Sequence, residues 1–173
     1  MYPNEYIDYL IHFHGDRDYF ECHEILEEYW KRVHPKNKHS IWVGLILFAV
    51  SNYHHRRGNT GGAKRTLSKS IQIFKKNLSQ IEKLGLNRGK FLLDLEKRQD
   101  DLSKGCQYTS YMFPIMDTSL ISSCRDKCTQ LGLNWCEDSD LNNKDLIHRH
   151  SLRDRSQVIQ ERLIALRSKA KAP

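Results

Sequence analysis

Residues 40–57, which read SIWVGLILFAVSNYHHRR, decide the fold class of this chain. The run from Ile41 to Val50 is apolar apart from one glycine, and a membrane-spanning helix would need roughly twenty such residues. The run therefore predicts a helix that is buried on most of its faces inside a globular protein. Gly58 and Asn59 follow it and are typical of a helix end.

Helical signals continue on both sides, and no segment shows the sustained alternation of a β-strand. Asp18 and Glu21 resemble a capping box for a helix that begins at residue 17 or 18 and ends at Val33, before His34-Pro35. Further helices are predicted at 3–14, from 60–63 to Gly85, and at 88–104, 118–131 and 151–168, with irregular segments at 105–114 and 134–143. The fold class predicted is all-α: a compact helical bundle of about five helices with an additional helical C-terminal region.

The helix that begins at residues 60–63 is predicted to be continuous up to Gly85. The apolar positions that repeat along it with helical spacing are Leu67, Ile71, Phe74, Leu78 and Ile81.

The length of 173 residues suits one domain with an added segment. We expect residues 1–104 to form the helical core domain and residues 105–173 a C-terminal helical extension of undefined role. The N-terminus lacks the basic and apolar regions of a secretion signal, and no membrane span is predicted. Five cysteines in such a chain indicate reduced thiols, so the expected location is the cytoplasm.

Charge is divided unevenly along the chain. Residues 1–33 carry eight acidic and three basic side chains, whereas residues 34–90 carry twelve basic side chains and one acidic side chain. One interpretation is that acidic helices pack against basic ones and that the excess is solvated. The other is that residues 34–90 form a surface for nucleic acid or for an acidic protein partner.

Two polar side chains of the 18–33 helix are expected to point partly inward, namely His23 and Glu27, whereas Glu24 is expected on the solvated side. Helical spacing also predicts an inward line on the 40–57 helix, formed by Val43, Leu47, Val50 and His54. A buried carboxylate needs a cation, a hydrogen-bond donor or a metal. We therefore expect His23, Glu27 and His54 to form one polar site.

His23, Glu27 and His54 are thus the candidate catalytic residues and the candidate ligands of a divalent transition metal such as zinc, iron or manganese. The same groups also suit a metal-free acid/base set or a satisfied packing network, and the sequence leaves these alternatives open. If the site is catalytic, hydrolysis through an activated water is the expected class, because no cofactor-binding fingerprint is present. A zinc protease is not expected, because Glu27 stands where the H-E-x-x-H pattern needs its second histidine.

The turn at residues 56–63 combines basic side chains with glycines. Arg57 and Asn59 are the candidate anion-binding residues, because a helix start offers free N–H groups. The interpretation that we favour is structural: Gly58 ends one helix, and Gly61 and Gly62 allow the two helices to approach closely. The residues assigned structural roles are Trp30, Phe20, Tyr53, Gly58 and Gly62.

Four cysteines lie beyond residue 104, at positions 106, 124, 128 and 136. Cys124 and Cys128 have the spacing of a structural zinc pair, but Cys106 and Cys136 do not form a second pair with such spacing. Buried, unreactive thiols are therefore the expected role of this set.

Two motifs in this order resemble the bacterial and archaeal domain of unknown function numbered 309. They are DYFECHEILEEYW at residues 18–30, and Gly44-Leu45-Ile46 followed by Tyr53-His54-His55-Arg56-Arg57-Gly58-Asn59 before Gly62-Ala63. The resemblance covers about residues 14–75 and implies a small all-helical domain without an assigned activity. The residues that match the family's signature are His23, Glu24, Glu27, Trp30, His54, Gly58 and Asn59.

One departure from the family's pattern concerns position 47. The family often continues Gly-Leu-Ile with glutamine, whereas this chain has Leu47, which implies a drier or altered site. Residues 85–173 carry no motif of the family, so we expect that half to be a lineage-specific addition.

Overall fold

The structure is a computed structural model that describes residues 1–152 and Gln160. All named elements are helices, so the predicted all-α class is confirmed; the described residues contain no β-structure beyond an isolated bridge between Leu86 and Ile115. The helices are α1 (Asn4–His14), α2 (Tyr19–Val33), α3 (Ile41–Arg56), α4 (Thr60–Lys76), α5 (Leu78–Lys83), α6 (Arg88–Ser103), α7 (Thr118–Gln130) and α8 (Lys144–Leu152).

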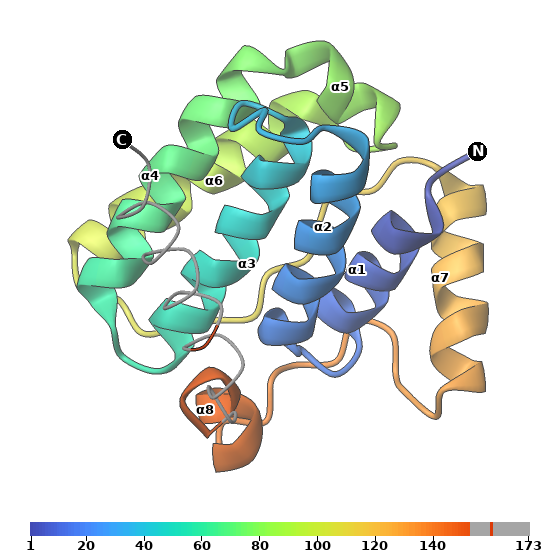
Figure 1. Ribbon diagram of the computed structural model, residues 1–173. Helices are drawn as coiled ribbons and strands as arrows, with labels where there is room; N and C mark the ends of the chain where they lie inside the picture. Colours follow the sequence, from blue (N-terminus) through green and yellow to red (C-terminus); the bar gives the residue numbers. More distant parts are fainter. Residues whose placement is uncertain (153–159, 161–173) are drawn as a thin grey trace.

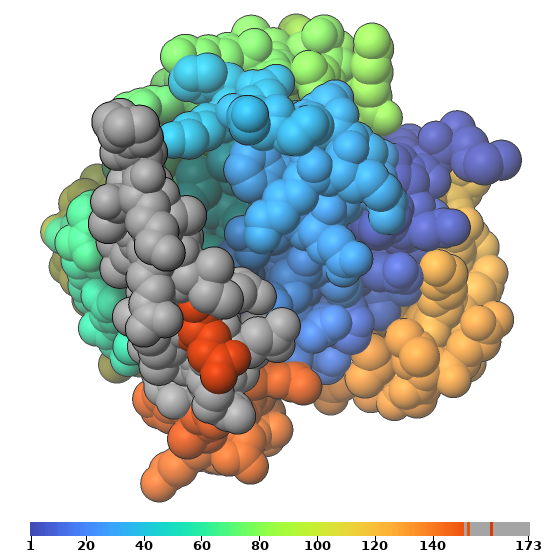
Figure 2. All heavy atoms as spheres, viewed as in Figure 1, coloured from blue at the N-terminus to red at the C-terminus, as the bar shows by residue number. Residues whose placement is uncertain are grey.

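Six helices pack as neighbours in the spatial order α7, α1, α2, α3, α4 and α6 (Figure 1). The short connections from α2 to α3 and from α3 to α4 make these helices antiparallel neighbours. In the space-filling view, α2 and the segment after it lie on the surface, while α3 is recessed beside them (Figure 2). The apolar helix predicted from residues 40–57 therefore lies at the centre of the row.

Side-chain caps fix the starts of the helices that carry the site. Asp18 accepts a hydrogen bond from the backbone N–H of Glu21 at 3.0 Å, and α2 begins at the next residue, as the capping pattern predicts. Asn59 caps α4 in the same way by accepting from the N–H of Gly62 at 2.9 Å. These caps position the ends of α2 and α4 next to the pocket described below.

An aromatic cluster joins the two halves of the chain. The ring of Phe13 in α1 lies 4.7 Å from that of Phe113 and 5.6 Å from that of Phe48 in α3, measured between centroids. Phe113 belongs to the segment 105–114, which has no helix and packs on the core. Residues on both sides of position 104 therefore share one hydrophobic core.

The prediction of one continuous helix up to Gly85 is wrong, because Asn77 separates α4 from α5. That residue leaves the helical conformation (φ −124°, ψ 37°), and its side-chain amide donates to the carbonyl oxygens of Ile73 at 2.8 Å and His39 at 2.9 Å. Leu78, predicted within the buried stripe, is 40% exposed. The side-chain amide of Asn77 competes with the helical backbone for hydrogen bonds. The spacing of apolar residues gives no sign of this competition.

A close approach of α3 and α4 occurs at Gly44, a position that the sequence did not single out for this role. A Cβ atom on Gly44 would lie 3.0 Å from Cε1 of Phe74 in α4. A Cβ atom on Gly62 would instead meet Nδ2 of Asn59, the cap of its own helix, at 2.7 Å. Gly62 thus leaves room for the cap.

The C-terminal half adds α7, whose bounds agree with the predicted 118–131 within one residue, and α8, which the sequence did not predict as a separate helix. The helix predicted at 151–168 lies outside the described residues except for Ser151, Leu152 and Gln160.

Candidate functional site

A pocket of about 150 Å³ lies between α2, α3 and α8. It brings His23 of α2 and His54 of α3 to one place, together with His150 of α8. The remaining walls are Tyr19, Phe20, Val50 and Tyr53. Two imidazoles from the predicted site therefore line a small, largely apolar pocket.

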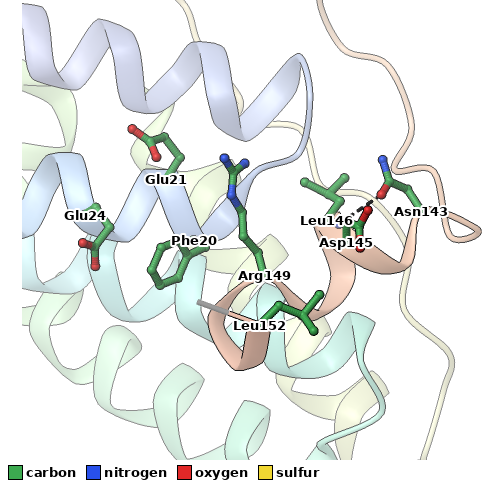
Figure 3. A pocket seen from close by; sticks show the side chains of 8 residues that line it. All are labelled: Phe20, Glu21, Glu24, Asn143, Asp145, Leu146, Arg149 and Leu152. Atoms are coloured by element: carbon green, nitrogen blue, oxygen red, sulfur yellow. Dashed lines mark hydrogen bonds between the residues drawn. The ribbon is translucent and has the colours of Figure 1, made fainter. Parts of the chain in front are cut away.

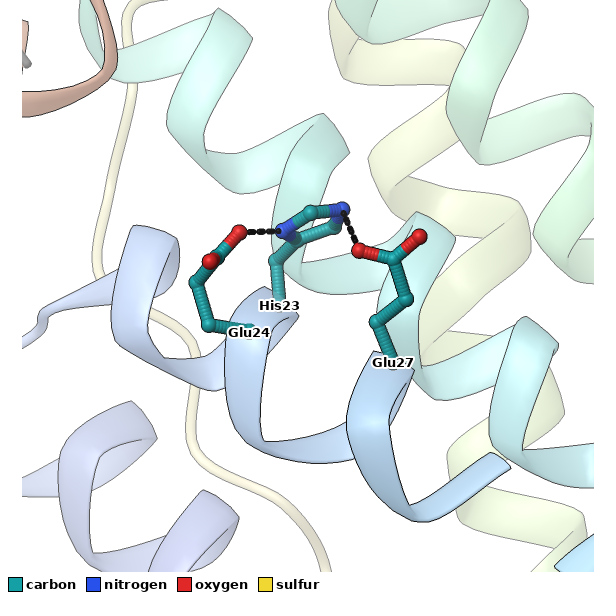
Figure 4. Close-up of side chains that lie close together, drawn as sticks. All are labelled: His23, Glu24 and Glu27. Atoms are coloured by element: carbon teal, nitrogen blue, oxygen red, sulfur yellow. Dashed lines mark hydrogen bonds and ion pairs between the residues drawn. The ribbon is translucent and has the colours of Figure 1, made fainter. Parts of the chain in front are cut away.

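His23 lies between two carboxylates (Figure 4). Its Nδ1 is 3.0 Å from Oε1 of Glu24, and its Nε2 is 3.5 Å from Oε2 of Glu27. The other oxygen of Glu27 is 3.1 Å from Nζ of Lys31. Within the described part of the chain, His23, Glu24 and Glu27 are the one group of potential metal ligands whose atoms all lie within 4.8 Å of one another.

Glu24, predicted on the solvated side, is as accessible as Glu27, with 34% of its side chain exposed. Its carboxylate nevertheless bends toward the neighbouring imidazole of His23, a contact that was not predicted. A helical wheel records the direction of the Cα–Cβ bond, whereas a glutamate is long enough to reach sideways from it. The signal that could have indicated this contact is the direct adjacency of His23 and Glu24 in the motif.

His54 lies beside the cap of α4. Because Oδ1 of Asn59 accepts from the N–H of Gly62, its Nδ2 amide is the group that faces Nδ1 of His54, at 3.2 Å. An amide nitrogen is a donor, so Nδ1 of His54 accepts and the proton of the neutral ring is on Nε2. Asn59 is thereby occupied by two internal contacts, and His54 is a hydrogen-bond donor through Nε2.

The surroundings of His54 favour its neutral form. Burial lowers the pKa of His54, and the charges of Arg57, His150 and Arg65 lower it further. Arg57 lies over the ring of Tyr53, with 5.3 Å between the guanidinium carbon and the ring centroid, and its NH1 donates to the Tyr53 hydroxyl. His54 is therefore uncharged near neutral pH and lies next to a cation.

The comparisons with known proteins give one matching family and one similar protein. The family described as domain of unknown function (DUF309) matches residues 6–66. The chain is also 48% identical over 162 residues to uncharacterized protein YpuF of Bacillus subtilis (strain 168), which covers 94% of this chain and 93% of that protein. The chain belongs to the DUF309 family. No solved structure matches it.

The match to YpuF is longer than the family region. Because it covers 94% of the chain, residues beyond position 85 are shared with this Bacillus protein and are not an addition peculiar to this chain. Among the described residues, no helix combines the length and apolar character that crossing a membrane requires.

The expectation that Val43, Leu47, Val50 and His54 form one inward line is wrong in part, because Val50 packs against the hydrophobic core whereas Val43 and Leu47 line a groove at α4. All four are only half-buried, whereas Leu45 and Phe48 on the other sides of α3 are fully buried. Val50 and His54 line the pocket at α2, but Leu47 lines a separate groove at α4. The departure from the DUF309 pattern at position 47 therefore lies next to the His23 pocket and not in it.

The other residues with predicted structural roles have the following contacts. Trp30 is half-buried and donates from its indole Nε1 to the carbonyl oxygen of Asn37 at 2.9 Å. Gly58 has a φ of +78°, which favours glycine at the end of α3. Phe20 and Tyr53 form walls of the pocket.

Two buried arginines near the pocket were not recognised in the sequence. Arg17 is 0% exposed and donates to carbonyl oxygens of Phe13, Tyr111 and Glu137, while Arg56 donates to the carbonyl oxygen of Arg17 and to Ser139. Their partners come mostly from residues far along the chain, so no local pattern could indicate them.

A wider, open pocket of about 890 Å³ lies between α2 and α8, on the other side of Glu24 (Figure 3). Glu21 and Glu24 come from α2, and Arg149 of α8 extends past Phe20 toward α2. Arg149 forms an ion pair with Asp18, which is buried at the start of α2. This contact holds α8 against the helix that carries His23.

The cysteines form no metal group within the described residues. Cys124 and Cys128 are buried in α7, and Cys106 is exposed. Burial raises the pKa of the Cys124 thiol to about 12, which makes it unreactive.

Proposed function

We propose that this protein binds a divalent transition metal at α2, with Nε2 of His23 and a carboxylate oxygen of Glu27 as the protein ligands. The observation that carries the proposal is the position of His23 between Glu24 and Glu27 (Figure 4). In the proposed tautomer Nδ1–H of His23 donates a hydrogen bond to the carboxylate of Glu24, which leaves the lone pair of Nε2 on the side of Glu27 for a metal. A carboxylate on the far nitrogen is the usual arrangement that orients a metal-binding histidine and raises its basicity.

His54 has a different role in this proposal from the ligand role predicted from the sequence. Its Nε2 carries the proton, so it is suited to donate a hydrogen bond to a group bound in the pocket and is not suited to coordinate the metal through that nitrogen. Arg57 supports the same anionic group through its charge next to His54.

Two protein ligands leave several positions on a metal for water and for a substrate. A metal held by His23 and Glu27 would supply an activated water, and the reaction class that we propose is hydrolysis of a small anionic substrate. The five cysteines are all free thiols, which supports the proposed location in the cytoplasm.

The test is the metal content and affinity of the untagged protein. We expect about one equivalent of zinc, manganese or iron per chain after dialysis, measured by mass spectrometry. His23→Gln and Glu27→Gln should remove it, and Glu24→Gln should weaken binding about 10- to 100-fold. Glu28→Gln is the matched control, because Glu28 is an exposed carboxylate on the same helix.

Circular dichroism of each variant checks that it is folded. Metal that stays bound in a folded His23→Gln protein, or the absence of binding by wild type at millimolar metal, would contradict the proposal. In the second case the His23 cluster serves packing, and His23→Gln should then change only the stability.

A further inference from the structure

The helix α4 is basic along its whole length. Between Thr60 and Lys76 it has no acidic residue, and its basic residues are Lys64, Arg65, Lys69, Lys75 and Lys76. Lys75 pairs with Glu96 of α6 at 3.0 Å. Lys69 and Lys76 have no ion pair with any residue that the structure describes, so their charges are not neutralised within it.

A groove of about 330 Å³ lies between α4 and α3, next to the connection that follows α2. Its rim consists of exposed polar residues, namely Lys38, His39, Lys69, Gln72 and Lys76. Its floor is aliphatic: Val43 and Leu47 are half-buried, and Ile73 is 7% exposed. Figure 2 shows the surface hollowed over α3.

We propose that this groove binds an amphipathic helix of a partner protein, with aliphatic side chains on its inner face and carboxylates along its edges. Val43 and Leu47 are four residues apart on α3, and Lys69, Ile73 and Lys76 follow one face of α4. A groove between antiparallel helices accepts a third helix by the packing that joins helices elsewhere. The unneutralised lysines select carboxylates and exclude a basic partner.

The composition of the groove disfavours nucleic acid. Proteins that bind single strands stack bases on aromatic rings, and those that recognise base edges use arginine forks. Among the described residues, the lining of the groove contains no Arg, Phe, Tyr or Trp. Lysines alone would attract phosphates, but the floor of Val43, Leu47 and Ile73 would then remain in water.

The test uses a fluorescein-labelled synthetic peptide of about 18 residues, with leucines on one helical face and glutamates beside them. The control peptide has the same composition with the leucines spread around the helix. Binding to the full chain is followed by fluorescence anisotropy at physiological salt. We expect a micromolar Kd for the first peptide and at least about tenfold weaker binding for the control.

Two variants separate the rim from the floor. Lys69→Glu/Lys76→Glu and Leu47→Gln should each weaken peptide binding about tenfold or more. Lys83→Glu/Lys97→Glu changes the net charge equally at exposed positions outside the groove and should leave binding unchanged.

Equal binding of both peptides, an unchanged Kd in folded Leu47→Gln, or no binding at about millimolar protein would overturn the proposal. So would binding of a single-stranded oligonucleotide that is lost in Lys69→Glu/Lys76→Glu while the peptide does not bind. The metal measurements above are independent of these results, because no residue is shared between the two sites.

Discussion

His14 at the end of α1 is held neutral by the fold. It is 1% exposed, its Nδ1 donates to the carbonyl oxygen of Leu10, and its Nε2 accepts from the N–H of Phe113 at 3.0 Å. Burial lowers the pKa of His14 from 6.5 to about 3, and Arg17 contributes to the same shift. A second proton on the ring would face the N–H of Phe113.

This neutral histidine predicts a loss of stability in mild acid. Because the folded pKa is below the unfolded value, the unfolded chain binds the proton first, and the free energy of unfolding falls as the pH drops below 6.5 toward 3. From pH 7 to pH 5 the contribution of His14 is roughly 2 kcal/mol. Urea unfolding at both pH values, for wild type and His14→Gln, measures it.

His14→Gln should be less stable at pH 7 but should lose roughly 2 kcal/mol less than wild type between pH 7 and pH 5. His12 is a control whose effect on the pH dependence should have the opposite sign, because hydrogen bonding to Asp16 raises its pKa in spite of burial. His12→Gln should therefore increase the loss at acid pH. Parallel pH dependence in wild type and His14→Gln would contradict the prediction, because it would show that His14 has the same pKa in the folded and unfolded states.

The residues that the sequence could identify are those whose partners are close along the chain. His23 and Glu27 are four residues apart on one helix, so their proximity follows from helical spacing. The contact of Asn59 with both Gly62 and His54 is also local, but its effect on the His54 proton depends on which amide atom faces which group. The long-range contact of His14 with Phe113 had no signal in the sequence.

At the scale of the elements, Gly44 sets how closely α3 and α4 pack. A Cβ atom there would lie 3.0 Å from Phe74, whose ring is fully buried and lies 4.9 Å from that of Phe91. Moving the ring away from Gly44 would disturb its packing against Phe91. Gly44→Ala should therefore destabilise the protein by about 1 kcal/mol, although alanine is the better helix former, and Gly44→Val by more.

Gly89 provides the control for this substitution. It lies in the first turn of α6, and the nearest atom to its added Cβ would be Oδ1 of Asn87 at 3.7 Å, an ordinary contact. Gly89→Ala should stabilise the protein slightly, by up to about 1 kcal/mol. Urea unfolding of both variants gives the comparison. If Gly44→Ala were as stable as wild type or more stable, α3 and α4 would be able to move apart enough to accept the added methyl group.

The elements were predictable where two local signals agreed. α2 has an Asp18 cap and a helical stripe, and α6 and α7 have the bounds predicted within one residue at each end. The break at Asn77 was not predictable, because the amide of Asn77 binds His39 from another connection. α8 was missed because it is short and polar, and one of its contacts, Arg149 with Asp18, spans most of the chain.

At the scale of the whole molecule, the relation between residues 1–104 and the remainder decides how the pocket is built. Arg17 is 0% exposed, and among its partners the carbonyl oxygens of Tyr111 and Glu137 lie beyond residue 104. Phe113 packs on Phe13, and His150 lines the pocket with His23. A site assembled in this way could not be read from the 18–59 region alone.

These contacts predict the behaviour of two shortened chains. In a chain of residues 1–104 alone, the guanidinium of Arg17 keeps one of its described partners, the carbonyl oxygen of Phe13. The same chain lacks Tyr111 and Phe113, which belong to the hydrophobic core. An unpaired buried charge costs several kcal/mol, comparable to the stability of a small domain. We therefore expect residues 1–104 to lack a cooperative urea transition and to be cleaved rapidly by protease.

Residues 1–152 retain every contact named here and should unfold in one transition close to that of the full chain. A cooperative transition of residues 1–104 within about 1 kcal/mol of the full chain would instead establish them as an independent core domain, as the sequence predicts, and would make Arg17 a group that is solvated when its distant partners are absent.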